Sequence, residues 1–187
     1  MPTKWWDTDS VGQFRRIANR FVVVIDRRDE YSRDQLLMRV QALLPALYSA
    51  GLELPSEPKK TSDDESDSGP ADNLGATEQF IERWKPLYDG LGAKLADWNH
   101  YRLIYDPYDP PTEPEVTGCL ADDLAGIYLD LLDGEELWAR EEFAEAVWGW
   151  QFAFESHWGR HVTGALRAIH ALAEESVGFP RPSSADV

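Results

Sequence analysis

Two histidines placed four residues apart on the apolar face of a predicted helix constrain this chain most. His157 and His161 lie in the sequence FAFESHWGRH and share their face with Trp150, Phe154 and Leu172. Residues four apart stand one above the other on a helix, and an apolar helix face turns toward the core. Because an unpaired buried polar group is costly, each imidazole needs a carboxylate, a carbonyl, a metal or a ligand as its partner.

A second polar set lies on a predicted helix that covers residues 118–133. Asp123 and Asp130 are seven residues apart, which places both at the border of the apolar stripe of that helix. We expect this helix to pack on the histidine helix, with carboxylates and imidazoles in hydrogen-bond reach, directly or through one water. The predicted interior polar cluster consists of Asp123, Tyr128, Asp130, Glu155, His157 and His161. Within it, Tyr128 or Glu155 would act as a base or as an orienting group.

Three interpretations of this cluster are open from the sequence. Aspartate–histidine pairs between helices can be structural pins that fix the register of the packing. Carboxylate oxygens and imidazole nitrogens are also ligands for Mn, Fe, Zn or Ni, and Asp123, His157 and His161 would then form a divalent-metal site. The third interpretation is a metal-dependent hydrolase, although Trp158 stands where H-E-x-x-H metalloproteases carry their glutamate. No nucleotide-binding glycine motif occurs, so we expect no cofactor beyond that metal, and enzymatic activity stays undecided.

Composition and periodicity predict an all-α protein, a five- or six-helix bundle in a single domain of residues 1–187. The chain is long enough for a sizeable core, and 43% of its residues are hydrophobic. Residues 56–73 combine acids, serines and prolines without a large apolar side chain, which predicts a disordered acidic linker. Residues 179–187 are predicted to be a flexible tail.

Capping residues and glycines set the expected helix boundaries. Ser32 and Gln35 have the capping-box spacing in front of an apolar run. The predicted helices cover residues 11–28 after a Ser10 cap, 33–50 before Gly51, a segment from about 77, 118–133 after a Thr117 cap, and 135–175 with a bend near Gly149 or Gly159.

Residues 98–116 are predicted to be an ordered, aromatic-rich loop, because four prolines exclude a helix there. Its rigid aromatic side chains suggest a surface that binds a protein partner. The residues of this predicted partner surface are Trp98, Tyr101, Tyr105 and Tyr108. The leading functional hypothesis is therefore a non-enzymatic cytoplasmic protein that binds a partner through an acidic, aromatic-rich surface.

Net charge and hydropathy narrow the remaining partner classes. The formal net charge of −16 disfavours nucleic acid, whose affinity comes mainly from lysine and arginine contacts to phosphate. The longest aliphatic run, residues 21–25, is too short to cross a bilayer, so no membrane partner is expected. The oligomeric state is left open.

Several motifs together resemble one bacterial family that is catalogued only as a domain of unknown function. They are YDP at 105–107, LADDLAGIYLDL at 120–131 and FESHWGRH at 154–161, with LLPALY at 43–48 and LELP at 52–55 resembling its opening helices. The resemblance covers most of the chain outside the acidic linker. It implies an all-helical bacterial protein without established activity. The family pattern often has an aspartate at the position of Gly126, so the resemblance implies one ligand fewer for a metal here.

Overall fold

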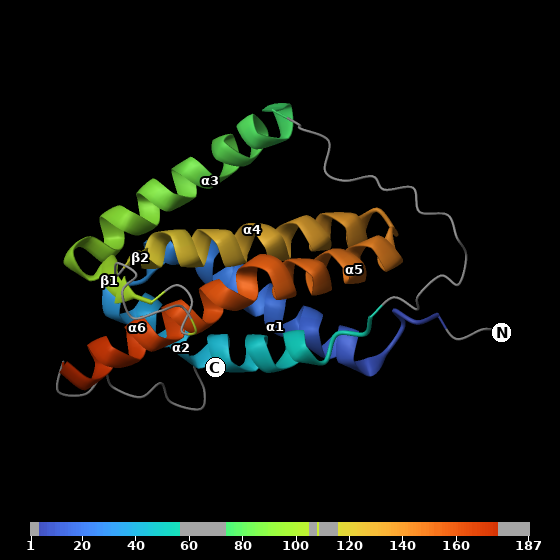
Figure 1. Ribbon diagram of the computed structural model, residues 1–187, viewed down its shortest axis with the longest axis horizontal. Coiled ribbons are helices and arrows are strands. Elements are labelled where there is room, and N and C mark those ends of the chain that lie inside the picture. The colour runs from blue at the N-terminus through green and yellow to red at the C-terminus, as the bar shows by residue number, and fades with distance from the viewer. Residues whose placement is uncertain (1–3, 57–73, 105–107, 109–115, 176–187) are drawn as a thin grey trace.

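The computed structural model describes residues 4–56, 74–104, 108 and 116–175, and these form a helical bundle with a small sheet at one end (Figure 1). The predicted mostly helical bundle is confirmed. The helices are α1 (Asp9–Asp26), α2 (Arg33–Leu52), α3 (Leu74–Leu95), α4 (Leu120–Ala139), α5 (Phe143–Ala153) and α6 (Gly159–Glu175). The strands are β1 (His100–Leu103) and β2 (Val116–Cys119).

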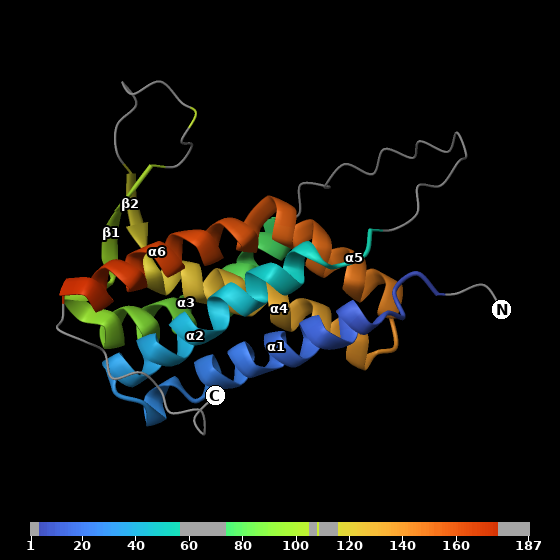
Figure 2. The ribbon, with the colours of Figure 1, turned by 90° about the horizontal axis from the view of Figure 1, so that it is seen from below.

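Helix α4 is the central element of the bundle. It contacts α1, α3, α5 and α6, while α2 lies against α1 and α6 (Figure 2). A helix with neighbours on several sides must bury several faces, and α4 does so with Leu120, Leu124, Ile127 and Leu131 fully buried. Polar side chains on such a helix lie inside the bundle unless they are at the border between two neighbouring helices.

Local sequence signals explain the starts of the first two helices. The Thr8 side chain caps α1 by accepting a hydrogen bond from the backbone N–H of Val11, so the expected Ser10 cap was wrong. At α2 the predicted capping box is confirmed: Ser32 Oγ accepts from the Gln35 N–H at 3.2 Å. In return Gln35 Oε1 accepts from the Ser32 N–H at 2.9 Å.

Gly51, which was expected to follow the end of its helix, lies inside α2, and Gly134 lies inside α4. Gly51 is buried in α2, where a Cβ atom would lie 2.7 Å from the Trp158 ring. Gly134 is buried in α4, where a Cβ atom would overlap the Trp150 indole. These glycines allow close approach of a tryptophan and do not end a helix, so α4 continues to Ala139 past the predicted boundary at Asp133.

The predicted long helix of residues 135–175 is divided into separate elements. Backbone at Glu141 adopts a positive φ of 65°, and the chain turns there between α4 and α5. A π-helical segment, Phe154–Trp158, then joins α5 to α6 directly before Gly159, near which the sequence predicted a bend. Gly149 lies within α5.

The prediction of an ordered, aromatic-rich loop over residues 98–116 was wrong at both of its ends. Strands β1 and β2 pair there antiparallel, with Tyr101 opposite Gly118. The four prolines lie between the strands and leave the strand residues free to pair. Thr117 belongs to β2, and Cys119 occupies the N-cap position of α4.

Two further predictions fall outside the described residues. They are the disordered linker, apart from Ser56, and the flexible tail at 179–187. Within the part of the chain that the structure describes, no helix combines the length and apolar character needed to span a membrane.

Candidate functional site

A continuous chain of hydrogen bonds joins β1, α4, the π-helical segment and α6. The Tyr101 hydroxyl donates to Asp123 Oδ2 at 2.8 Å, and Asp123 Oδ1 lies 2.8 Å from His161 Nδ1. His161 Nε2 lies 3.2 Å from His157 Nε2, and His157 Nδ1 lies 2.6 Å from Asp130 Oδ2. The predicted approach of two carboxylates and two imidazoles within hydrogen-bond reach is confirmed. We call these five residues the Tyr–Asp–His network.

The antiparallel packing of α4 and α6 explains which residues pair (Figure 1). Asp123 pairs with His161 and Asp130 with His157, in opposite orders along the chain. Seven residues of helix rise about 10.5 Å and four residues about 6 Å. The two carboxylates are therefore farther apart along α4 than the two imidazoles are along their helix. Each Nδ1 atom points toward its own carboxylate, and the two Nε2 atoms face each other between the carboxylates.

Gly126 lies between the two aspartates on α4 and faces both imidazoles. A Cβ atom on Gly126 would lie 3.3 Å from His161 Nε2 and 3.4 Å from His157 Cε1. Both distances are tight, so a side chain at this position would push against the rings. Glycine here leaves room for the two imidazoles to meet.

Two other glycines hold Tyr101 in place at the buried end of the network. Gly118 is its cross-strand partner, and a Cβ atom there would overlap the Tyr101 ring. On α6, a Cβ atom on Gly164 would lie 2.6 Å from the Tyr101 hydroxyl oxygen. The ring therefore lies flat on β2, and its hydroxyl reaches past α6 to Asp123.

Burial differs among the members of the network, and His157 is the most exposed of its aspartates and histidines. The exposed fraction of the side chain is 8% for Asp123 and 20% for His161, but 45% for His157. Burial raises the pKa of the Asp123 carboxyl, while the hydrogen bonds from His161 and Tyr101 oppose that rise. Burial, followed by the charge of Asp123, raises the pKa of Tyr101, whose hydroxyl stays protonated and donates.

At the solvent end, the hydrogen bond that His157 Nδ1 donates to Asp130 raises the pKa of His157, against a smaller opposing effect of burial. An ionised carboxylate only accepts hydrogen bonds, so both Nδ1 atoms carry a hydrogen when both aspartates are charged. Two neutral imidazoles would then face each other with a lone pair on each Nε2. The 3.2 Å contact needs one shared proton or one cation between those atoms.

The separation of the Nε2 atoms also fits a metal ion. With Zn–N bonds of about 2.0–2.1 Å, two nitrogens on a tetrahedral ion lie about 3.3 Å apart. Metal-bound histidines typically donate their other N–H to a carboxylate, as His157 and His161 are placed to do here. In the described ranges, however, no group of three or more His, Cys, Asp or Glu side chains is arranged to hold a metal. The geometry thus offers two nitrogen ligands, with Asp123 as an orienting group.

The model of a family described as "Domain of unknown function (DUF5063)" matches residues 7–175. The chain belongs to this family. The resemblance to an uncharacterised domain family that the motifs indicated is confirmed. A search of curated proteins finds no match. The crystal structure of protein BF1032 from Bacteroides fragilis is similar, with a TM-score of 0.68 and 20% sequence identity over 97% of this chain and 99% of that one. At this identity the likeness shows a shared fold.

Two residues predicted for the polar cluster of this DUF5063 chain have other partners. The Tyr128 hydroxyl donates to Asp26 Oδ1 on α1 at 2.7 Å, and burial raises the pKa of Tyr128 to about 12. Glu155 is exposed and accepts from Gln151 at 3.2 Å. Both side chains point away from the imidazole pair because they lie on other faces of their helices.

The four aromatic residues of the predicted partner surface do not form one exposed group. Trp98 is partly buried and has the Arg33 guanidinium 3.5 Å from its ring centroid. Tyr101 packs against the core and belongs to the Tyr–Asp–His network. Tyr108 is 95% exposed, and Tyr105 lies outside the described residues.

Sequence reasoning missed the network role of Tyr101 and the glycines that accommodate it. Val116 and Thr117 are β-branched, which is a local signal for β2. Placing a strand there would have brought Tyr101 next to the start of α4. No local signal links Gly126 or Gly164 to the network, because each contacts it through tertiary packing.

Proposed function

We propose that the protein binds one divalent transition-metal ion through His157 Nε2 and His161 Nε2. The observation that carries this proposal is the convergence of these atoms at 3.2 Å while each Nδ1 is held by an aspartate. This arrangement presets both tautomers, so that both Nε2 lone pairs are available to one ion. Imidazole ligands suit Zn, Ni and Cu.

Water or an external ligand would complete the coordination. His157 is nearly half exposed, which gives an ion and its remaining ligands a route from solvent. Asp123 and Asp130 would act as orienting groups that raise the basicity of the ligands. This differs from the ligand set expected from the sequence, in which Asp123 binds the metal directly.

A shared proton is the competing occupant of the same position. It would make the cluster the structural pin considered from the sequence. Both occupants satisfy the two Nε2 atoms, and both leave the aspartate contacts intact. They differ in metal stoichiometry and in the effect of metal on stability, so measurement separates them.

The test uses protein purified without a histidine tag and stripped with EDTA. Titration calorimetry with Zn²⁺ or Ni²⁺ should show one ion per chain, and the thermal midpoint should rise. At a free-metal concentration of 100 times Kd, binding adds about 2.7 kcal/mol to the unfolding free energy. Because protons compete for imidazole, the affinity should fall as the solution becomes acidic.

A matched pair of double variants controls this experiment. His157→Ala/His161→Ala should lose the ion while circular dichroism still shows a folded helical protein. His100→Ala/His170→Ala removes the same number of imidazoles from exposed positions outside the network and should keep the ion. Metal-free protein whose melting is unchanged by either ion would refute the proposal and favour the shared proton.

Binding of a protein partner has less structural support. Of the described aromatic residues that motivated it, Tyr108 is fully exposed, whereas Trp98 and Tyr101 pack against the core. A pull-down with a Tyr108→Ser variant as the control tests it. Specific capture by the wild type that the variant loses would support a role for Tyr108 in partner binding.

A further inference from the structure

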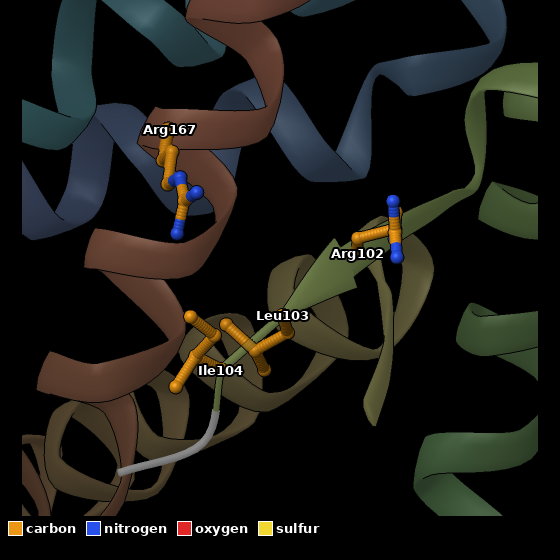
Figure 3. Close-up of a pocket in the computed structure, with 4 residues that line it drawn as sticks. All are labelled: Arg102, Leu103, Ile104 and Arg167. Carbon is orange, nitrogen blue, oxygen red and sulfur yellow. The ribbon is translucent and has the colours of Figure 1, made fainter. Parts of the chain in front are cut away.

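A cleft lies between β1 and α6, and Tyr101 is among the residues that line it. Its larger part has a volume of about 380 Å³, and a smaller part of about 200 Å³ adjoins it. Arg102 of β1 and Arg167 of α6 line both parts. Figure 3 shows Arg167 extending from α6 toward Leu103 and Ile104 at the end of β1. The volume is in the range of small-molecule sites, about 300–1,000 Å³.

The charge of the cleft is opposite to that of the whole protein. Among the described residues that line it, Arg102, Arg167 and His100 are basic, and Asp97 is the one carboxylate. The formal net charge of the chain is −16. In the part of the chain that the structure describes, Arg167 has no ion-pair or hydrogen-bond partner. An anion repelled by the rest of the surface would therefore be attracted here.

The walls of the larger part are aromatic and apolar. Trp98, Tyr101 and Leu172 line it together with two alanines of α6, Ala168 and Ala171. Tyr101 is fixed at its hydroxyl by Asp123, and Arg33 covers Trp98. Walls that are already ordered cost little entropy when a ligand binds. Flat apolar groups would fit against such walls, with an acidic group directed to Arg167.

We propose that this cleft binds a small organic anion, with a flat ring against Trp98 and Tyr101 and a carboxylate or phosphate group held by Arg167. Guanidinium groups recognise both acids through paired, charge-assisted hydrogen bonds. The site is separate from the proposed metal position and does not need an ion there. Among the described residues, Tyr101 both lines the cleft and belongs to the Tyr–Asp–His network.

Calorimetric titration of EDTA-treated protein tests the proposal with three probes. 2-Naphthoate and 2-naphthyl phosphate carry the two acidic groups, and 2-naphthalenemethanol is their neutral counterpart. At least one anion should bind saturably and move the Trp98 indole resonance in the NMR spectrum, which a Trp98→Phe variant assigns. The neutral probe should bind at least about tenfold more weakly, since a hydrogen bond to a charged group adds about 1.5–3 kcal/mol.

Arginine variants identify the residue that selects the anion. Arg167→Ala should weaken anion binding at least about tenfold, whereas Arg20→Ala, an exposed arginine on α1 outside the cleft, should leave it unchanged. Equal binding of the neutral probe, no effect of Arg167→Ala, or no saturable binding of either anion would each overturn the proposal. The EDTA keeps these outcomes independent of metal binding.

Discussion

Replacing Tyr101 by phenylalanine removes one hydrogen bond from the Tyr–Asp–His network and keeps the ring that packs on Gly118. The lost bond is 2.8 Å long, and its acceptor Asp123 is 8% exposed. A hydrogen bond to a charged group contributes about 1.5–3 kcal/mol, and a buried carboxylate has no water to replace it. We therefore expect Tyr101→Phe to lower the unfolding free energy by about 2 kcal/mol.

Tyr128→Phe is the matched control for this measurement. Its hydroxyl also donates to an aspartate, Asp26, at 2.7 Å, but this bond lies at the surface. Solvent replaces an exposed contact of this kind, and its loss should cost less than about 1 kcal/mol. Urea unfolding of the metal-free proteins gives both values. A cost for Tyr101→Phe no larger than that for Tyr128→Phe would refute the reasoning from burial.

The same substitution has a second, independent consequence. The hydrogen bond from Tyr101 lowers the pKa of the Asp123 carboxyl against the larger effect of burial. Tyr101→Phe should therefore raise that pKa further, which carbon NMR of the carboxyl measures. An Asp123 pKa that stays constant would show that the hydroxyl does not stabilise the charged form.

Two further predictions concern other parts of the network. The hydrogen bond to Asp130 raises the pKa of His157 in the folded protein. Protonated His157 therefore adds to the unfolding free energy of the metal-free protein below about pH 6.5, and this contribution is lost as the pH rises through the folded-state pKa. Asp130→Asn should lower that pKa in an NMR titration and flatten the decline of unfolding free energy above about pH 6.5. An unchanged titration would contradict the assigned hydrogen bond. Gly164→Ala places a Cβ atom 2.6 Å from the Tyr101 oxygen and should destabilise the fold by about 1–3 kcal/mol. Gly149→Ala meets nothing within 4 Å and should stabilise α5 by up to about 1 kcal/mol in urea unfolding. If both substitutions changed the unfolding free energy in the same direction, the space around each glycine would not determine the effect of an added Cβ atom.

The sequence alone determined the helical class and the helix faces on which the polar residues lie. The predicted interior position was right for Asp123, whereas His161 and Asp130 are partly buried and His157 is 45% exposed. Spacing along a single helix decides which side chains share a face, so His157, His161, Asp123 and Asp130 could be placed on facing helices without coordinates. The capping box at Ser32 is equally local and was predicted correctly. These features depend on residues within a few positions of each other, where backbone geometry is nearly constant.

Tertiary structure decided how those elements meet. The pairing of each aspartate with one histidine follows from the antiparallel packing of α4 and α6. The approach of Tyr101 from a strand depends on Gly118 and Gly164, which are 17 and 63 residues away along the chain. A glycine at a helix end and a glycine beneath a tryptophan look alike in sequence, as Gly51 demonstrates. Only the packed fold separates them, because the contact that requires the missing side chain comes from another element.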